Sequence, residues 1–135
     1  MSIKIFVLAS SIYIKKNQFD SVLVALQALQ GRETTGRTGH LHFMWLPCCD
    51  LNDVQSVEEM FKLWRWSVEF NEEGDIVSLG FVGEKLGDED LFLATIAPYV
   101  CCGSEIIVSE DYKIWRWLFD GIACEKQYGR IVFGE

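Results

Sequence analysis

The residues of this sequence that could do chemistry are five cysteines, two histidines and several groups of carboxylates. The cysteines are Cys48, Cys49, Cys101, Cys102 and Cys124, an odd number in which two pairs are adjacent. Neighbouring residues of a strand point to opposite faces, so an adjacent pair does not readily form a disulfide bond. We therefore interpret the cysteines as reduced thiols of a cytoplasmic protein and expect them to be small apolar residues of the core.

One short segment brings histidines close to cysteines and could form a metal site or a thiol nucleophile with its base. His40 and His42 precede Cys48 and Cys49 along the chain. The C-x2-C spacing typical of zinc sites is absent, and no predicted helix begins at these cysteines to lower a thiol pKa. We expect no metal, no cofactor and no cysteine-dependent catalysis. A small enzyme or ligand-binding domain with a pocket lined by His42, Cys48 and aromatic residues is an alternative interpretation.

Two groups of carboxylates could act as a general acid and a general base. They are Glu72, Glu73 and Asp75, in a predicted turn, and Asp88, Glu89 and Asp90, at a predicted helix start. Solvation explains the first group, and a favourable interaction with the helix dipole explains the second. Because no apolar pocket that would raise a carboxylate pKa can be placed beside them, we expect no acid/base catalysis.

The segment from Gly31 to Thr38 has the spacing of a phosphate-binding loop, with Arg37 in the position of the usual lysine. Such a loop needs a strand before it and a helix after it, so that backbone N–H groups surround the phosphate. Here the predicted helix comes first and the strand follows. The sequence therefore predicts a mobile surface loop over 31–39 and no bound nucleotide.

The hydrophobic pattern predicts the elements that must position these groups. Helical spacing predicts helices over 18–30, 57–64 and 88–99, and Ser56 with Glu59 forms a capping box before the second. Alternation predicts strands over 3–8, 41–46, 66–70, 77–81, 104–109, 112–119 and 122–133. The resulting order is β-α-β-α-β-β-α-β-β-β. Tight turns at 71–74 and at Asp120-Gly121 indicate a mainly antiparallel sheet with helices on one face, a single α+β domain over 1–135.

Aromatic residues indicate where the core lies. Trp115, Trp117 and Phe119 share one face of a predicted strand, and Gly129 marks a predicted bulge in the last strand. The triplet Trp-Arg-Trp occurs twice, at 64–66 and 115–117. An ancient duplication or two aromatic-rich strands that pair in one core would each explain it.

Composition and charge restrict the function. Half of the residues are hydrophobic, which argues against disorder, and the longest apolar run near the N-terminus is too short to span a membrane. The net charge of −8 argues against direct binding of nucleic acid. The acids concentrate between residues 50 and 111, mainly at predicted turns and helix starts. An acidic rim of this kind steers a basic partner, although solubility is an alternative explanation.

Several short motifs in the second half of the chain carry a resemblance. They are Trp64-Arg65-Trp66, the segment 83–88, the segment 96–100, Gly103-Ser104, Trp115-Arg116-Trp117, Phe119-Asp120-Gly121 and Gly129-Arg130-Ile131. The chain resembles small acidic bacterial proteins of the toxin-immunity or phage-inhibitor type. That resemblance implies a protein that binds one protein partner tightly and blocks its active or nucleic-acid site.

We therefore expect a non-enzymatic inhibitor that occludes a basic site on a protein partner, such as a nuclease toxin or effector. The expected partner-binding residues are Glu72, Glu73, Asp75, Asp88, Glu89 and Asp90. The alternatives are the small enzyme or ligand-binding domain described above and a structural subunit of a complex. No oligomeric state follows from the sequence.

Overall fold

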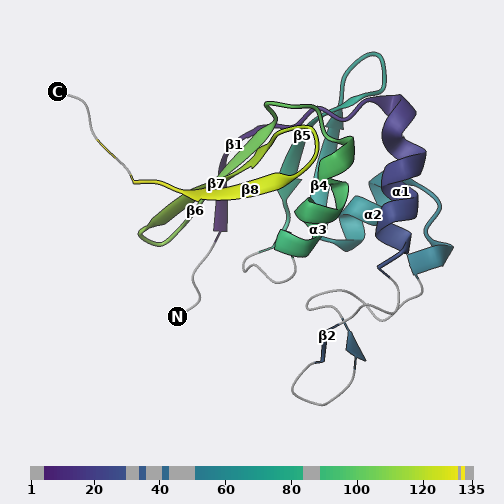
Figure 1. Ribbon diagram of the computed structural model, residues 1–135, viewed down its shortest axis with the longest axis horizontal. Helices are drawn as coiled ribbons and strands as arrows, with labels where there is room; N and C mark the ends of the chain where they lie inside the picture. Colours follow the sequence, from purple (N-terminus) through teal and green to yellow (C-terminus); the bar gives the residue numbers. More distant parts are fainter. Residues whose placement is uncertain are drawn as a thin grey trace.

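Figure 1 shows the computed structural model of the chain, in which residues 5–29, 34–35, 41–42, 51–83, 89–130 and 132 are described. The elements are β1 (Ile5–Ser11), α1 (Phe19–Gln27), β2 (Thr34–Thr35), β3 (Leu41–His42), α2 (Val57–Leu63), β4 (Trp66–Phe70), β5 (Ile76–Phe81), α3 (Glu89–Ile96), β6 (Glu105–Glu110), β7 (Lys113–Phe119) and β8 (Cys124–Tyr128). Short 3-10 turns lie at Lys16–Gln18, Leu51–Asp53 and Ala97–Tyr99. The α+β class and the predicted order of elements are confirmed.

The main sheet has the strand order β1-β6-β7-β8, and each pair of neighbouring strands in it is antiparallel. The alternating residues of β7 decide which face is buried: Trp115, Trp117 and Phe119 are all nearly inaccessible to solvent. This confirms the predicted core face of that strand. The opposite face carries Ile114 and Arg116, which are half-buried.

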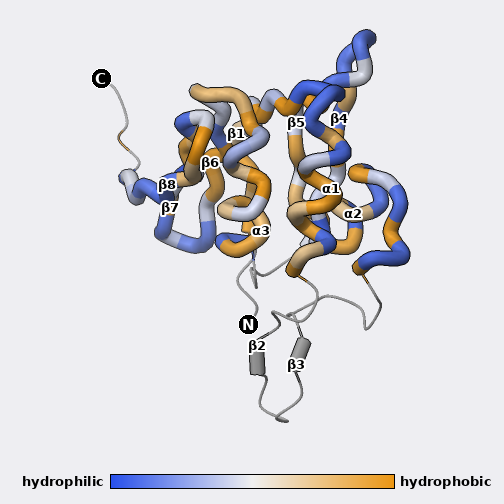
Figure 2. The backbone as a smooth tube through the Cα atoms, turned by 45° about the vertical axis from the view of Figure 1, so that its right-hand side comes forward, coloured by the Kyte–Doolittle hydropathy of each residue, from blue (hydrophilic) through white to orange (hydrophobic). Residues whose placement is uncertain are grey.

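The hairpin formed by β4 and β5 is a separate two-stranded sheet that lies beside β1. Ile14 and Ile76 exchange two backbone hydrogen bonds of 3.0 Å, and the N–H of Leu79 donates to Oγ of Ser10 at 3.0 Å. β1 therefore connects the main sheet, through β6, with the hairpin. Hydrophilic residues gather at the turn of this hairpin, whereas its strands are mostly apolar (Figure 2).

The helices pack on the buried side of these strands, with Phe92 of α3 at the centre. Its ring centroid lies 5.0 Å from that of Phe61 in α2, 5.6 Å from that of Trp64 and 6.2 Å from that of Trp66 in β4. α2 begins as its sequence predicts, because Oγ of Ser56 accepts a hydrogen bond from the backbone N–H of Glu59 at 3.1 Å. Among the described residues, no helix has the length and apolar character that a membrane crossing would need.

Three expectations need correction or lie outside the described residues. β8 ends at Tyr128, and Gly129 continues its register without a bulge, since its N–H donates to the carbonyl oxygen of Ile114 at 3.0 Å. The strands that carry the two Trp-Arg-Trp triplets, β4 and β7, belong to different sheets and do not pair. Of the loop expected at 31–39, Thr34 and Thr35 form β2, which pairs with β3, and the other residues lie outside the described part.

Candidate binding surfaces

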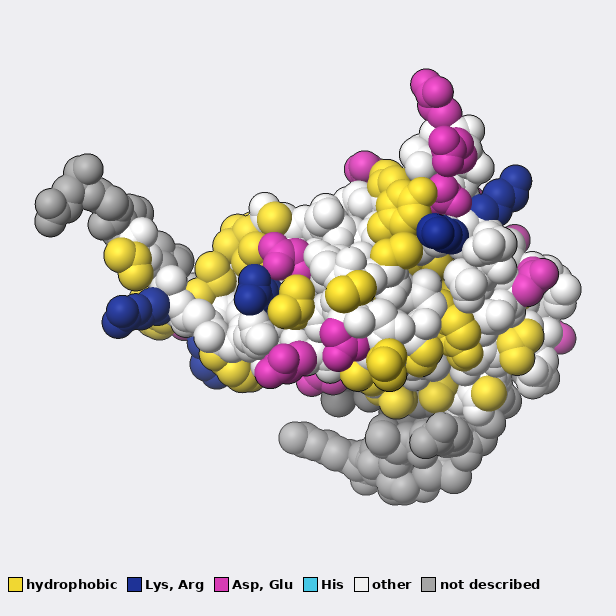
Figure 3. All heavy atoms as spheres, turned by 45° about the horizontal axis from the view of Figure 1, so that its top comes forward, with side chains coloured by type: hydrophobic (Ala, Val, Ile, Leu, Met, Phe, Trp, Pro, Cys, Tyr) yellow, Lys and Arg dark blue, Asp and Glu magenta, His cyan; other side chains and the backbone are white. Residues whose placement is uncertain are grey.

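The turn between β4 and β5 projects from the body of the protein and is acidic at its tip (Figures 1 and 3). Glu69, Glu72 and Glu73 are exposed there. The turn closes through hydrogen bonds from the backbone N–H groups of Glu73 and Asp75 to Oδ1 of Asn71, at 3.0 and 2.9 Å. Two of the six expected partner-binding residues, Glu72 and Glu73, are thus presented to solvent.

Asp75 holds the base of this hairpin instead of facing a partner. Its carboxylate accepts hydrogen bonds from Oη of Tyr13 and from the backbone N–H of Lys16, both at 2.7 Å, and only 8% of the residue is exposed. The hydrogen bond from Tyr13 and then that from Lys16 lower the pKa of Asp75, while the same carboxylate raises the pKa of Tyr13. Asp75 therefore remains charged and attaches the hairpin to the segment that follows β1.

Glu89, at the start of α3, forms a buried ion pair with Arg65. Its side chain is 5% exposed, and that of Arg65 is 18% exposed. Arg65 adopts a left-handed backbone conformation, with φ of 70°, and its guanidinium lies 4.8 Å from the ring centroid of Phe81. The pair joins α3 to the junction between α2 and β4, so Glu89 has a structural role.

Asp90 is exposed but already has partners within the chain. Its Oδ1 accepts a hydrogen bond from Nε1 of Trp117 at 2.9 Å, and its Oδ2 lies 3.6 Å from Nζ of Lys126. The Lys126 ammonium also lies 4.9 Å from the ring centroid of Trp115, within the range of a cation–π interaction. Because the side chain of Asp90 is 67% exposed, it can also contact a partner at this end of the sheet.

The six expected residues do not form one rim. Glu72 and Glu73 precede β5, whereas Glu89 and Asp90 follow it, and Asp88 lies outside the described residues. A strand rises about 3.3 Å per residue, so the length of β5 separates the two groups by about 20 Å. Figure 1 shows the acidic turn and the start of α3 at opposite ends of this strand. The hairpin tip is therefore the acidic surface that can act as a unit.

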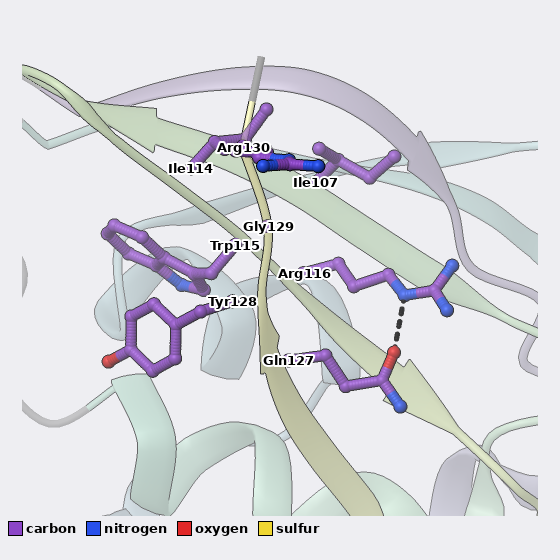
Figure 4. A pocket seen from close by; sticks show the side chains of 8 residues that line it. All are labelled: Ile107, Ile114, Trp115, Arg116, Gln127, Tyr128, Gly129 and Arg130. Atoms are coloured by element: carbon purple, nitrogen blue, oxygen red, sulfur yellow. Dashed lines mark hydrogen bonds between the residues drawn. The ribbon is translucent and has the colours of Figure 1, made fainter. Parts of the chain in front are cut away.

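A groove that the sequence did not predict lies along β7 and β8, with a volume of about 290 Å³. It is bordered by Ile107, Ile114, Arg116, Gln127, Gly129 and Arg130, with the aromatic residues Trp115 and Tyr128 beside them. In Figure 4, the guanidinium of Arg130 lies near Ile107, and Arg116 and Gln127 point away from Trp115 and Tyr128. In the sequence, only Gly129 followed by Arg130 after an alternating strand would indicate this groove. A glycine at the end of a strand is also common in turns, so it does not predict a binding site.

The described cysteines are less buried than expected. Cys102 is exposed and Cys101 is half-buried, so the assignment of these two to the core was wrong, whereas the half-buried Cys124 packs against the core. Cys102 is exposed because it occupies a turn in which the N–H of Ser104 donates to the carbonyl oxygen of Cys101. Burial, followed by the charges of Asp90 and Asp120, raises the pKa of Cys124 to about 12, so its thiol is protonated at neutral pH and a poor nucleophile.

The pocket expected around His42 and Cys48 lies largely outside the described residues. These exclude His40, Cys48 and Cys49 and the side chain of His42. Within the described part of the chain, no three histidine, cysteine or acidic residues come together as metal ligands. Comparisons with protein-family models, with curated proteins and with solved structures found no match.

Proposed function

We propose that the protein is a non-enzymatic binding protein that occludes a basic site on a protein partner with its acidic β4–β5 hairpin. The observation that carries this proposal is the projecting turn, which presents Glu72 and Glu73 and is held at its base by Asp75. A tip that is ordered before binding loses little conformational entropy when it docks. A nuclease toxin or effector is a suitable partner because its active site must itself be basic to hold phosphate.

The hairpin also offers an apolar anchor among its carboxylates. Phe70, at the end of β4, is 42% exposed, and its ring centroid lies 6.2 Å from that of Phe19 in an edge-to-face arrangement. An aromatic ring that is partly exposed and held by a neighbour is typical of an energetically important contact. In the proposed complex the carboxylates of Glu69, Glu72 and Glu73 occupy positions where the phosphates of a nucleic acid would lie.

Charge reversal tests this proposal. The partner is captured from the native host, and its association with the wild type and with Glu72→Lys/Glu73→Lys is measured at several salt concentrations. We expect the double variant to associate at least about tenfold more slowly and with a weaker dependence on salt, since peripheral charges act mainly on the association rate. The matched control is Asp53→Lys/Glu58→Lys, which makes the same change in net charge at exposed positions near α2.

Two results contradict the proposal. One is an equal loss of association in the two double variants, which would show that net charge alone matters. The other is capture of a small metabolite or of nucleic acid without any protein at every salt concentration, which would favour the ligand-binding alternative.

A further inference from the structure

We propose that the free edge of β8 and the groove beside it bind an extended, carboxylate-bearing segment of a protein partner as an added strand. β8 is the last strand of the main sheet. The N–H of Gly129 donates to the carbonyl oxygen of Ile114, and that of Asp120 donates to the carbonyl oxygen of Ala123. In an antiparallel ladder this register directs the N–H and C=O groups of Lys126 and Tyr128 away from β7.

These outward groups have no backbone partner among the described residues. They are therefore available to a strand that pairs with β8 along the outer edge of the sheet. The register of β8 also determines where the side chains of such a strand point. A residue opposite Gln127 or Gly129 would direct its side chain to the face of the sheet that holds the groove.

Gly129 leaves open the part of the groove that lies above Ile114. A Cβ at this position would lie 3.9 Å from Cγ2 of Ile114, in van der Waals contact, and a larger side chain would extend into the groove. Small-molecule sites usually enclose roughly 300–1,000 Å³, so an open groove of about 290 Å³ is small for such a ligand. It is large enough for one or two side chains of an added strand, whose main chain would supply the remaining contacts.

The charge of the groove selects a carboxylate. The described residues that line it include Arg116 and Arg130 and no acidic residue, although the whole chain carries a net charge of −8. Arg116 is held by Gln127, at 2.8 Å from its Nε, and by Glu105, at 3.2 Å from its Nη1. Arg130 is exposed and forms no ion pair with any described residue. A guanidinium with no carboxylate partner in the described part of the chain, beside the apolar residues Ile107 and Ile114, suits the carboxylate of an otherwise apolar strand.

A second copy of this chain fits the edge less well. Antiparallel pairing of two β8 strands about Lys126 would place the two Lys126 side chains directly opposite each other, and like charges in that position are destabilising. The surface also differs from the acidic hairpin in charge and location. A partner's acidic strand bound at β8 and a partner's basic site bound at the hairpin would therefore make separate contacts with this protein.

The test uses the whole protein and two synthetic hexapeptides with alternating threonine and valine residues. One peptide has a central glutamate, and the other has glutamine in its place. Binding is followed by amide hydrogen exchange, resolved by residue, and by titration of backbone NMR shifts. We expect the glutamate peptide to protect the N–H groups of Lys126 and Tyr128 and to bind about tenfold more tightly than the glutamine peptide.

Two variants and a control separate the parts of the site. Gly129→Val fills the groove at a position without positive φ, and we expect it to weaken both peptides at least about fivefold. Arg130→Gln is expected to remove the preference for glutamate and to leave the glutamine peptide unchanged. Lys62→Gln makes the same charge change on the exposed surface of α2 and should alter neither peptide. The NMR spectrum of each variant verifies its fold.

Several outcomes would overturn this inference. Two of them are no binding of either peptide at millimolar concentration and equal binding of the two peptides. The third is protection of the β8 amides that rises with protein concentration in the absence of peptide, because that result would identify a second copy as the occupant. Charge reversal at Glu72 and Glu73 should leave peptide binding unchanged. Failure at β8 is therefore distinguishable from failure of the hairpin proposal.

Discussion

The indole N–H of Trp117 donates a hydrogen bond to Oδ1 of Asp90 at 2.9 Å, and this bond attaches the first turn of α3 to the middle of β7. Trp117 is 2% exposed, and the carboxylate of Asp90 satisfies the one hydrogen-bond donor of this buried side chain. One acidic residue thus satisfies a buried donor and remains at the surface. It also shows why an exposed carboxylate in this protein can have a structural role.

Removing the carboxylate of Asp90 should therefore destabilise the protein. We expect Asp90→Ala to lower the free energy of unfolding by about 1–3 kcal/mol, because a buried donor is left unpaired. The matched control is Asp20→Ala, which removes an exposed carboxylate from the first turn of α1 and should cost only about 0.3–1 kcal/mol through the helix dipole. Urea unfolding of the two variants measures the difference. Equal losses would show that the bond to Trp117 contributes nothing beyond the dipole term.

The ion pair between Glu89 and Arg65 should contribute more to stability than an exposed pair. We expect Glu89→Gln to cost about 3 kcal/mol, because it removes the negative charge from a largely buried ion pair. Glu105→Gln breaks the more exposed pair with Arg116, whose side chains are 30% and 42% exposed, and should cost less than about 1 kcal/mol. Unfolding in urea at one pH compares the two. A similar cost for both would contradict a structural role for Glu89.

The network at Asp75 should make the stability of the protein sensitive to acid. Its pKa is lowered in the folded state, so its contribution is present above the ordinary aspartate pKa of about 3.9 and is lost as the pH falls toward the lower folded value. We expect Tyr13→Phe, which removes the main donor, to be less stable at neutral pH and to lose less additional stability on acidification. Urea unfolding between pH 7 and pH 3 measures how the free energy of unfolding of the wild type and of the variant changes with pH. An equal change in the two proteins would contradict this role of Asp75.

The described cysteines should differ in reactivity. At neutral pH we expect a maleimide to modify the exposed Cys102 in the folded protein and to leave Cys124 unmodified, because the thiol of Cys124 is half-buried and has a pKa of about 12. Mass spectrometry of peptides from protein labelled with and without denaturant measures this contrast. Rapid labelling of Cys124 in the folded protein would show that its thiol is not kept protonated and inaccessible.

Features set by neighbouring residues could be predicted from the sequence. The N-cap at Ser56, the buried alternation of Trp115 and Trp117, and the turn at 71–74 depend on residues only a few positions apart. The pairing of distant strands could not be predicted in the same way. Alternation indicates which face of a strand is buried, but it does not identify the neighbouring strand.

The acidic residues show a second limit. Counting charges treats every carboxylate as solvated, whereas Asp75 is bound by Tyr13, 62 positions earlier, and Asp90 by Trp117, 27 positions later. Hydrogen-bond donors at such separations have no local sequence signal. The groove at β8 was missed for a related reason, since it is lined by residues of β6, β7 and β8 that come together only when these strands pair.

The pairing of β1 with β6 has a consequence for how the protein is made. Ile5 pairs with Glu110 and Ser11 with Glu105, so the first strand of the sheet leaves the ribosome long before its partner. At ordinary elongation rates that interval is roughly 5–20 s, during which the edge of β1 that will pair with β6 has no partner strand. The sheet closes only after β6 has been synthesised, and a nascent chain that stalls earlier would expose an aggregation-prone strand to chaperones and proteases.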